Sequence, residues 1–246
     1  MKQYGVILLI CAILLTAFAG CGKNSSTSTP PTNTHPASIS IGGKTYSTDL
    51  TELDLKNQGL TDISALKYMT KLTRLDLSLL TGYAASGTDL NSNDVSDISA
   101  LAGLTRLTYL NLSGNPVSDL RPLAGLTNLT QLYLNESSIS DISSLAGLTN
   151  LTTLNLYDNQ ISDISALAGL TKLTTLYLHN NHISDISALA GLINLISLGL
   201  RGNQISDISA LTGLTKLTSL WVNYNLLSDD QVDALRTALP NCEIYS

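Results

Sequence analysis

Carboxylates repeated at a fixed interval are the first candidates for acid–base or metal chemistry in this chain. They are Asp97, Asp119, Asp141, Asp163, Asp185, Asp207 and Asp229, each 22 residues after the last, with Asp62 standing 35 residues before Asp97. Seven of the eight follow a serine, and five of them stand in the same short word, Ser-Asp-Ile-Ser. A general acid or base needs a distinct environment, whereas a repeated word gives every copy the same one. We therefore assign these aspartates structural roles and no catalysis.

Histidine and cysteine ligands are equally weak candidates. His179 and His182 lie three residues apart, but one is expected on a strand and the other in the following turn, with no cysteine or carboxylate cluster beside them. Three Cys and three His are too few for a disulfide framework or a structural zinc domain. No phosphate-binding glycine loop and no nucleophile elbow occurs. We predict that the protein is not an enzyme and holds no metal or cofactor.

Binding chemistry has to come from the remaining polar and aromatic residues. The 246 residues are 43% hydrophobic, 13% charged and 5% aromatic, and 13 basic against 19 acidic residues leave a net charge of −6. This balance argues against an electrostatic nucleic-acid partner. The few aromatic residues become informative only once the elements that carry them are placed.

A 22-residue repeat organises the chain over 50–228. The words Ser-Asp-Ile-Ser, Ala-Leu-Ala-Gly-Leu and Leu-Thr-x-Leu-x-Leu recur along the chain, and the unit that they mark has eight copies, interrupted by an insertion at 79–91. In one copy, Leu110 and Leu112 alternate as the inward residues of a short strand, and Ser118-Asp119 can cap a short helical turn. One coil cannot bury its leucines alone, so the coils must stack and their strands must form a parallel sheet.

The repeat resembles the 22-residue leucine-rich repeat of internalin-like bacterial surface proteins over roughly residues 50–242. The resemblance implies an α/β fold: a right-handed leucine-rich-repeat solenoid with a parallel β-sheet on its concave face and short 3₁₀ or helical turns on its convex face. It also implies a ladder of asparagine side chains from coil to coil, and a protein as the partner. Gln58 and Ser137 replace asparagine at the ladder position, so their two coils are expected to be looser.

Both ends of the solenoid need caps. Residues 38–49 predict a small hairpin with a Gly42-Gly43 turn, which would cover the first coil. In the segment 229–246, Ser228-Asp-Asp-Gln231 matches a capping box, which predicts a C-terminal capping helix ending before Pro240. A last strand over 241–244 would follow, with Cys242 buried as a small hydrophobe.

The N-terminus predicts an export signal. Residues 1–20 hold an apolar run of signal-peptide length. This run ends in Phe18-Ala-Gly-Cys21, which resembles the lipobox of bacterial lipoproteins and implies that Cys21 becomes lipidated; an ordinary signal peptide is the alternative. The rest of 21–37 is a Ser/Thr/Pro-rich tether. We expect an extracytoplasmic domain, lipid-anchored to the bacterial cell membrane at the cell surface.

On each strand, three outward positions flank the inward leucines and form three columns across the sheet. The only Trp and four of the ten Tyr fall in these columns, and Tyr, Trp and Arg are enriched in binding hot spots. The predicted partner-binding residues are Tyr109, Tyr133, Tyr157, Tyr177, His179, Arg201, Trp221 and Tyr224.

The residues from Tyr133 to Trp221 are expected to form one contiguous patch, with a notch at Gly199 for a partner side chain or a sugar. Tyr83, on the insertion, is a further candidate contact. The prediction is a non-catalytic, membrane-anchored, monomeric binding module whose concave face engages a protein. The alternatives are a glycan- or cell-wall-binding surface protein and a structural surface spacer.

Overall fold

The computed structural model describes residues 35–79 and 92–246. The signal peptide at 1–20, Cys21, most of the tether and Tyr83 therefore lie outside the described residues. Within the described residues, no helix is both long enough and apolar enough to span a membrane.

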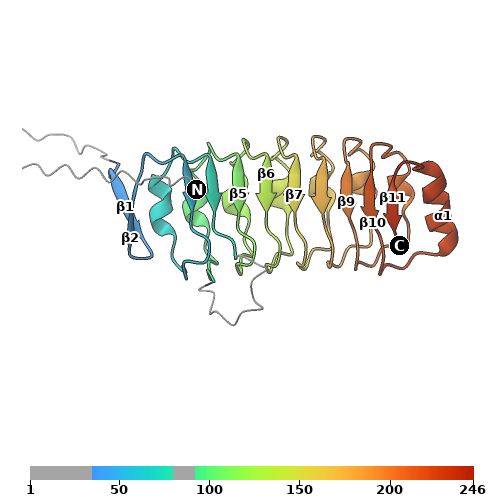
Figure 1. Ribbon diagram of the computed structural model, residues 1–246, viewed down its shortest axis with the longest axis horizontal. Helices are drawn as coiled ribbons and strands as arrows, with labels where there is room; N and C mark the ends of the chain where they lie inside the picture. The colour runs from blue at the N-terminus through green and yellow to red at the C-terminus, as the bar shows by residue number, and fades with distance from the viewer. Residues whose placement is uncertain (1–34, 80–91) are drawn as a thin grey trace, which may run out of the picture. The chain divides into compact units, whose positions relative to one another are not determined.

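A parallel sheet of nine short strands runs along one side of the repeats within the described residues (Figure 1). Its strands are β3 (Glu52–Asp54), β4 (Arg74–Asp76), β5 (Tyr109–Asn111), β6 (Gln131–Tyr133), β7 (Thr153–Asn155), β8 (Thr175–Tyr177), β9 (Ser197–Gly199), β10 (Ser219–Trp221) and β11 (Glu243–Tyr245). Neighbours in the sequence are neighbours in the sheet. The repeat spacing sets the register, because the inward leucine of each strand pairs with the next, as Leu110 does with Leu132.

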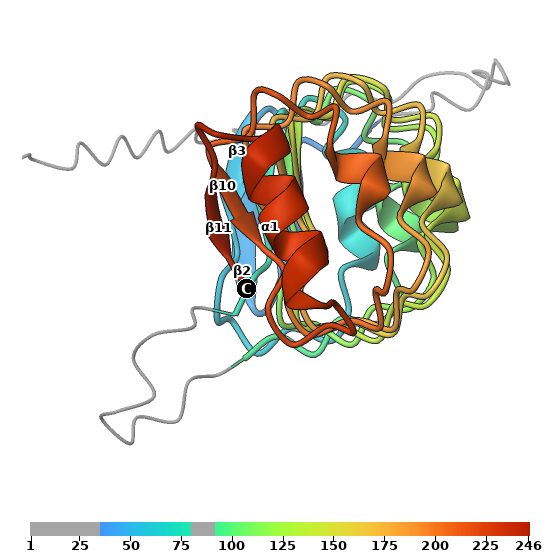
Figure 2. The ribbon, with the colours of Figure 1, turned by 90° about the vertical axis from the view of Figure 1, so that its right-hand side faces the viewer.

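Short 3₁₀ turns lie on the opposite side of the coils from the sheet (Figure 2). They are η1 (Ser64–Tyr68), η3 (Ser99–Leu101), η4 (Arg121–Leu123), η5 (Ser143–Leu145), η6 (Ser165–Leu167), η7 (Ser187–Leu189) and η8 (Ser209–Leu211). The repeated aspartate precedes each turn and accepts a backbone hydrogen bond two residues on, as Asp97 Oδ1 does from the Ser99 N–H at 2.8 Å. The row of carboxylates is therefore structural.

The core lies between the sheet and the 3₁₀ turns. It consists almost wholly of leucine and isoleucine, and Leu110, Leu112, Leu123 and Leu126 are each fully buried. Each coil contributes one layer of such residues and stacks on the layers before and after it. The predicted leucine-rich-repeat solenoid is confirmed, with its parallel sheet, its 3₁₀ turns and its C-terminal helix.

Asparagine side chains join successive coils, as the resemblance to leucine-rich repeats implied. Asn159 Nδ2 donates to the carbonyls of Leu134 at 2.9 Å and Leu156 at 3.1 Å, while its Oδ1 accepts from the Ile139 N–H at 3.0 Å. The ladder is broken at Ser137, whose Oγ is buried without a hydrogen-bond partner. An asparagine at 137 would accept a hydrogen bond from the Val117 N–H. With serine there, this N–H donates to the carbonyl of Asn115 at 2.7 Å.

The two ends of the solenoid carry different caps. At the N-terminal end, β1 (Ser38–Ile41) and β2 (Lys44–Ser47) form an antiparallel hairpin. Its turn needs positive φ at both central residues, and two glycines supply it, with φ of 55° and 75°. At the C-terminal end, the helix α1 (Asp229–Ala238) begins with a complete capping box between Ser228 and Gln231.

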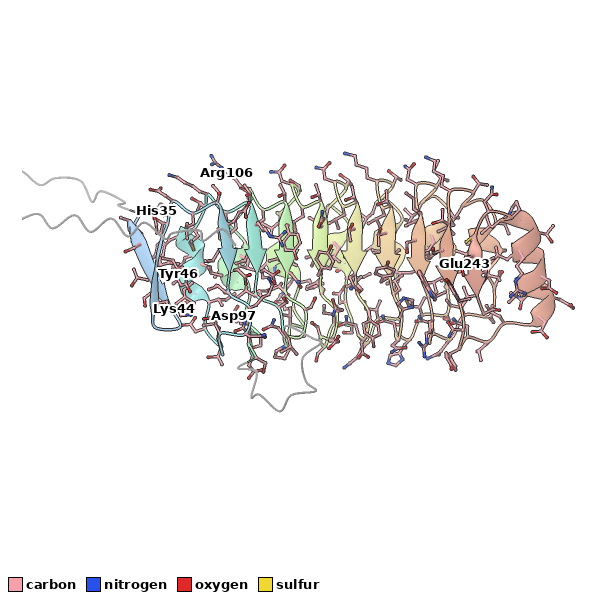
Figure 3. The ribbon with its side chains drawn as sticks, viewed as in Figure 1. His35, Lys44, Tyr46, Asp97, Arg106 and Glu243 are labelled. Carbon is pink, nitrogen blue, oxygen red and sulfur yellow. The ribbon has the colours of Figure 1, made fainter. Side chains whose placement is uncertain are left out.

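The last strand differs from the sequence expectation. β11 (Glu243–Tyr245) extends to Tyr245 and pairs in parallel with β10, so it continues the sheet by one more rung. Cys242 lies just before it and is half-buried rather than buried. Burial, followed by the nearby charge of Glu243, raises the pKa of the Cys242 thiol. Glu243 lies at the far end of the sheet from the hairpin that carries Lys44 and Tyr46 (Figure 3).

Candidate binding surface

The outward side chains of the nine strands form the sheet face, which is the candidate binding surface. On β8, Thr175 and Tyr177 flank Leu176, which is fully buried, so both point away from the core. The register places Asn155, Tyr177, Gly199 and Trp221 in one column across four strands. The periodicity of the repeat therefore brings these residues together from positions 22 apart.

Five rings on the C-terminal half of the sheet face contact one another, and we call them the aromatic cluster. Its members are Tyr157, Tyr177, His179, Trp221 and Tyr245. His179 lies at the centre, stacked on Tyr177 with ring centroids 5.7 Å apart and an interplanar angle of 16°. Its ring also meets Trp221 edge-on at 6.0 Å and Tyr157 at 6.2 Å. Offset and edge-to-face pairs of this kind hold rings in fixed orientations.

The predicted notch at Gly199 is filled by His179. A Cβ at position 199 would overlap the imidazole, whose nearest atoms are Nε2, Cε1 and Cδ2. Gly199 is buried as a result. The notch prediction was wrong because it treated each side chain as pointing straight out of the sheet. The imidazole of His179 instead leans across to the next strand.

One hydrogen bond fixes the tautomer of the neutral His179 ring. Its Nδ1 accepts the backbone N–H of Arg201 at 3.2 Å, so the neutral ring carries its proton on Nε2. Burial among the rings, and then the positive charge of Arg201, lower the pKa of His179. The ring is therefore mostly uncharged at neutral pH, as a stacked ring in an apolar cluster should be.

Tyr245 belongs to the aromatic cluster although the sequence analysis did not select it. Its ring stacks on Trp221 with centroids 5.3 Å apart and an interplanar angle of 3°. The register pairs Ile244 with Leu220 and Tyr245 with Trp221. Aligning Glu243-Ile244-Tyr245 with Ser219-Leu220-Trp221 would have placed Tyr245 in the central column.

Tyr109 and Tyr133 form a second group rather than part of one contiguous patch. Their ring centroids are 5.5 Å apart, and the Arg74 guanidinium lies 3.4 Å above the Tyr109 ring. Within the described coils, no ring contact links Tyr133 to the aromatic cluster, and Asn155 stands between Tyr133 and Tyr177 in the central column. Burial is the main cause that raises the pKa of Tyr133.

The first rungs carry charges that neutralise one another. Lys56 Nζ lies 2.9 Å from Asp54 and 3.3 Å from Asp76, whose side chain is only 4% exposed. Asp76 Oδ2 also lies 4.0 Å from Arg74 and accepts the Tyr109 hydroxyl at 3.3 Å. These contacts satisfy the buried carboxylate, so this part of the sheet face is an internally paired network.

Arg201 and Tyr224 border the aromatic cluster. The Arg201 guanidinium lies 4.9 Å from the centre of the Tyr224 ring, which is 73% exposed. Two shallow hollows, of about 360 Å³ and 260 Å³, open beside the cluster and share Tyr157, His179 and Trp221. Asn180 and Arg201 complete the first hollow, and Asn155 and Tyr177 complete the second.

A larger hollow of about 510 Å³ lies among the 3₁₀ turns, beside Asp163 and Asp185. Both carboxylates accept turn N–H groups, from Ser165 and Ser187, at 2.8 Å. Among residues 35–79 and 92–246, no three His, Cys, Asp or Glu side chains gather as a metal site would require. We therefore place the candidate site at the aromatic cluster.

The comparisons with known proteins agree with this architecture. The family model described as leucine-rich repeats in two copies matches residues 89–125, 105–147, 127–169, 149–191 and 193–237. Leucine-rich-repeat proteins are typically non-enzymatic binding modules, and their fold commonly mediates protein–protein interaction. No curated protein matches the chain in sequence.

Among solved structures, internalin C2 from Listeria monocytogenes is 34% identical and matches with a TM-score of 0.72 over 82% of this chain and 84% of that one. Internalin F from the same organism is 33% identical, with a TM-score of 0.53 over 75% and 64% of the two chains.

The leucine-rich-repeat ectodomain of the Arabidopsis thaliana receptor kinase GASSHO1/SCHENGEN3, in complex with Casparian strip integrity factor 2, is 29% identical. Its TM-score is 0.57, and the match covers 68% of this chain and only 20% of the receptor chain. The repeat model, together with the identity and coverage of internalin C2, shows that this chain belongs to the leucine-rich-repeat family and is an internalin-like member of it.

Proposed function

We propose that this chain is a non-catalytic binding module that engages a protein partner through the aromatic cluster on its sheet face. The cluster is the observation that carries the proposal. Its rings are half-buried, apart from the more exposed Tyr245, so they contact one another and still present area to a partner. Rings held by mutual contacts lose little conformational freedom on binding, which favours affinity.

The composition of the surrounding surface supports the same proposal. The hot spots of protein interfaces are enriched in tyrosine, tryptophan and arginine, and these residue types are concentrated where Trp221, Tyr177 and Arg201 lie. Threonine and serine fill the neighbouring column on β7 to β10 and make a polar rim. In the plant receptor structure, a leucine-rich-repeat ectodomain is likewise in complex with another factor.

The test is a capture experiment on the full chain. A Tyr177→Ala, Trp221→Ala double variant should keep its circular dichroism spectrum but lose a partner cross-linked from host or bacterial surface extracts. Tyr68→Ala is the matched control, because Tyr68 is a partly exposed aromatic on η1, away from the strands. Capture that survives the double variant contradicts the proposal. Saturable sugar binding on a glycan array, with quenching of Trp221, would point to the glycan alternative.

We further propose that lipidation of Cys21 anchors the module to the outer side of a bacterial cell membrane. The lipobox-like ending of the apolar run and the polar tether after it support this. A Cys21→Ser variant should lose palmitate labelling and appear in the culture medium. Labelling that persists in this variant contradicts the anchor.

A further inference from the structure

The three cations on the strand columns of the sheet face differ in their pairing. Lys56 lies within ion-pair distance of Asp54 and Asp76, and Arg74 lies 4.0 Å from Asp76. Arg201, in contrast, has no carboxylate within ion-pair distance among residues 35–79 and 92–246; its guanidinium lies over the ring of Tyr224. The guanidinium is oriented by this ring, while its charge has no opposite partner.

This unpaired charge lies at the wall of a hollow. Arg201 and Asn180 are the polar residues that line the hollow of about 360 Å³, and Tyr157, His179 and Trp221 are its aromatic residues. The Asn180 side chain packs against Gly202, where an added Cβ would come within 2.5 Å of Asn180 Oδ1. Two polar side chains and three rings therefore line a space large enough for a side chain.

We propose that this hollow receives an acidic side chain of the protein partner, with the guanidinium of Arg201 paired to the carboxylate and an adjacent apolar or aromatic residue of the partner packed on Trp221. This inference rests on the proposed function and names the chemistry of the partner at that surface. A guanidinium presents two parallel N–H donors that match the two oxygens of a carboxylate.

The local charge favours a carboxylate over a doubly charged phosphate. His179 also lines this hollow, and its lowered pKa leaves it mostly neutral at neutral pH, so the hollow offers one full positive charge. The chain as a whole has a net charge of −6, so it does not attract an acidic partner from a distance. The pairing should therefore slow dissociation more than it speeds association.

The test uses peptides selected against the full chain. A random peptide library displayed on phage is panned on the wild-type protein, with removal of peptides that bind Trp221→Ala. Selected peptides should carry Asp or Glu within about two residues of an aromatic or large aliphatic residue. Their affinity is then measured by fluorescence titration of Trp221, which is the only Trp in the chain.

Arg201→Met should weaken a selected peptide about tenfold, as expected for loss of a charge-assisted hydrogen bond. Replacing the acidic residue of the peptide by Gln or Asn should weaken it by a similar factor, and the two losses should not add if the groups pair. The matched control is Arg106→Met, because Arg106 is exposed at the edge of the repeats (Figure 3). Its binding should equal that of the wild type.

The outcomes separate this inference from the proposed function. Peptides that need Trp221 but bind Arg201→Met as tightly as the wild type overturn the acidic-partner inference and leave the proposed function standing. Additive losses in the Arg201→Met and peptide variants overturn it as well. A selection that yields no Trp221-dependent peptide contradicts the proposed function and this inference together.

Discussion

The imidazole of His179 covers Gly199 on the neighbouring strand, where the ring occupies the space that a Cβ would need. This contact explains why glycine stands in a column that otherwise carries larger side chains on the adjacent strands, Tyr177 and Trp221. It also fixes the centre of the aromatic cluster, because His179 is the ring that touches Tyr157, Tyr177 and Trp221. Position 199, which is buried under this imidazole, therefore controls the arrangement of the cluster.

Gly199→Ala should destabilise the protein and disturb the aromatic cluster. The new Cβ must displace the imidazole, and overpacking of this kind costs about 1–3 kcal/mol. Urea unfolding should show a lower free energy of unfolding, and Trp221 emission should shift because its ring neighbour moves.

Two controls test whether His179 is the cause. Gly191→Ala adds the same methyl group where nothing lies within 4 Å, so it should be nearly neutral. Adding His179→Ala to Gly199→Ala should recover part of the lost stability, because the overlap is relieved. If Gly199→Ala is no less stable than Gly191→Ala, the side-chain arrangement described for His179 is wrong.

The fluorescence of Trp221 should report the protonation of His179. The imidazolium form quenches indole emission, and the two ring centroids are 6.0 Å apart. Because burial and Arg201 lower the pKa of His179 below its ordinary 6.5, the midpoint of the quenching should lie below pH 6.5. The neutral ring favours folding above the unfolded pKa, and this contribution is lost as pH falls through the folded pKa.

A pH titration of emission checks this, with His179→Gln and His182→Gln as variants. The transition should disappear in His179→Gln and persist in His182→Gln, since His182 is exposed and lies beyond the strand. A midpoint at or above pH 6.5 would contradict the burial of His179.

The sheet and the core were predictable because they depend only on residue type and spacing, and the asparagine ladder was implied by the family resemblance. A leucine repeated every 22 residues reaches the same point of each coil, whatever the outward residues are. The filling of the Gly199 notch was not predictable in this way. It depends on the side-chain torsions of His179, which the repeat pattern does not specify.

Two further differences have similar physical reasons. Tyr245 was missed because the words of the repeat stop before β11, although its strand register continues. The predicted single patch is divided because Asn155 lies between Tyr133 and Tyr177, and because Tyr133 packs on Tyr109 instead. Membership of a column was predictable, whereas the pairing of rings along the column was not.

The repeated aspartates should make the free energy of unfolding decrease at acidic pH. Hydrogen bonds from turn N–H groups are the main cause that lowers the pKa of Asp141, Asp163, Asp185 and Asp207. At Asp119, the Arg121 side chain contributes first and brings the pKa to about 2. Because the folded pKa values lie below the unfolded value of about 3.9, their contribution is full above that pH and is lost as pH falls through the folded values.

Replacing Asp141, Asp163, Asp185 and Asp207 with asparagine, while Asp119 is kept, tests the acid dependence. Asparagine keeps an oxygen that can accept the turn N–H but carries no charge. The variant should lose less stability than the wild type between about pH 5 and about pH 2.5 in urea unfolding. An equal loss in the two proteins would show that these carboxylates are not the groups whose protonation destabilises the fold.

Ser137→Asn should repair the broken rung of the asparagine ladder and stabilise the protein. The preceding residue, Glu136, has φ of 56°, close to the 57° of Asp158 before the ladder residue Asn159, so the backbone already has the required form. An asparagine at 137 could accept a hydrogen bond from the Val117 N–H, as Asn159 accepts one from Ile139. The free energy of unfolding should rise by about 1 kcal/mol.

The reverse change, Asn159→Ser, should lower the free energy of unfolding by about 1–3 kcal/mol, because it leaves buried backbone groups unpaired. Urea unfolding of both variants measures the difference, and a Ser137→Asn protein no more stable than the wild type would mean that the serine rung is already satisfied.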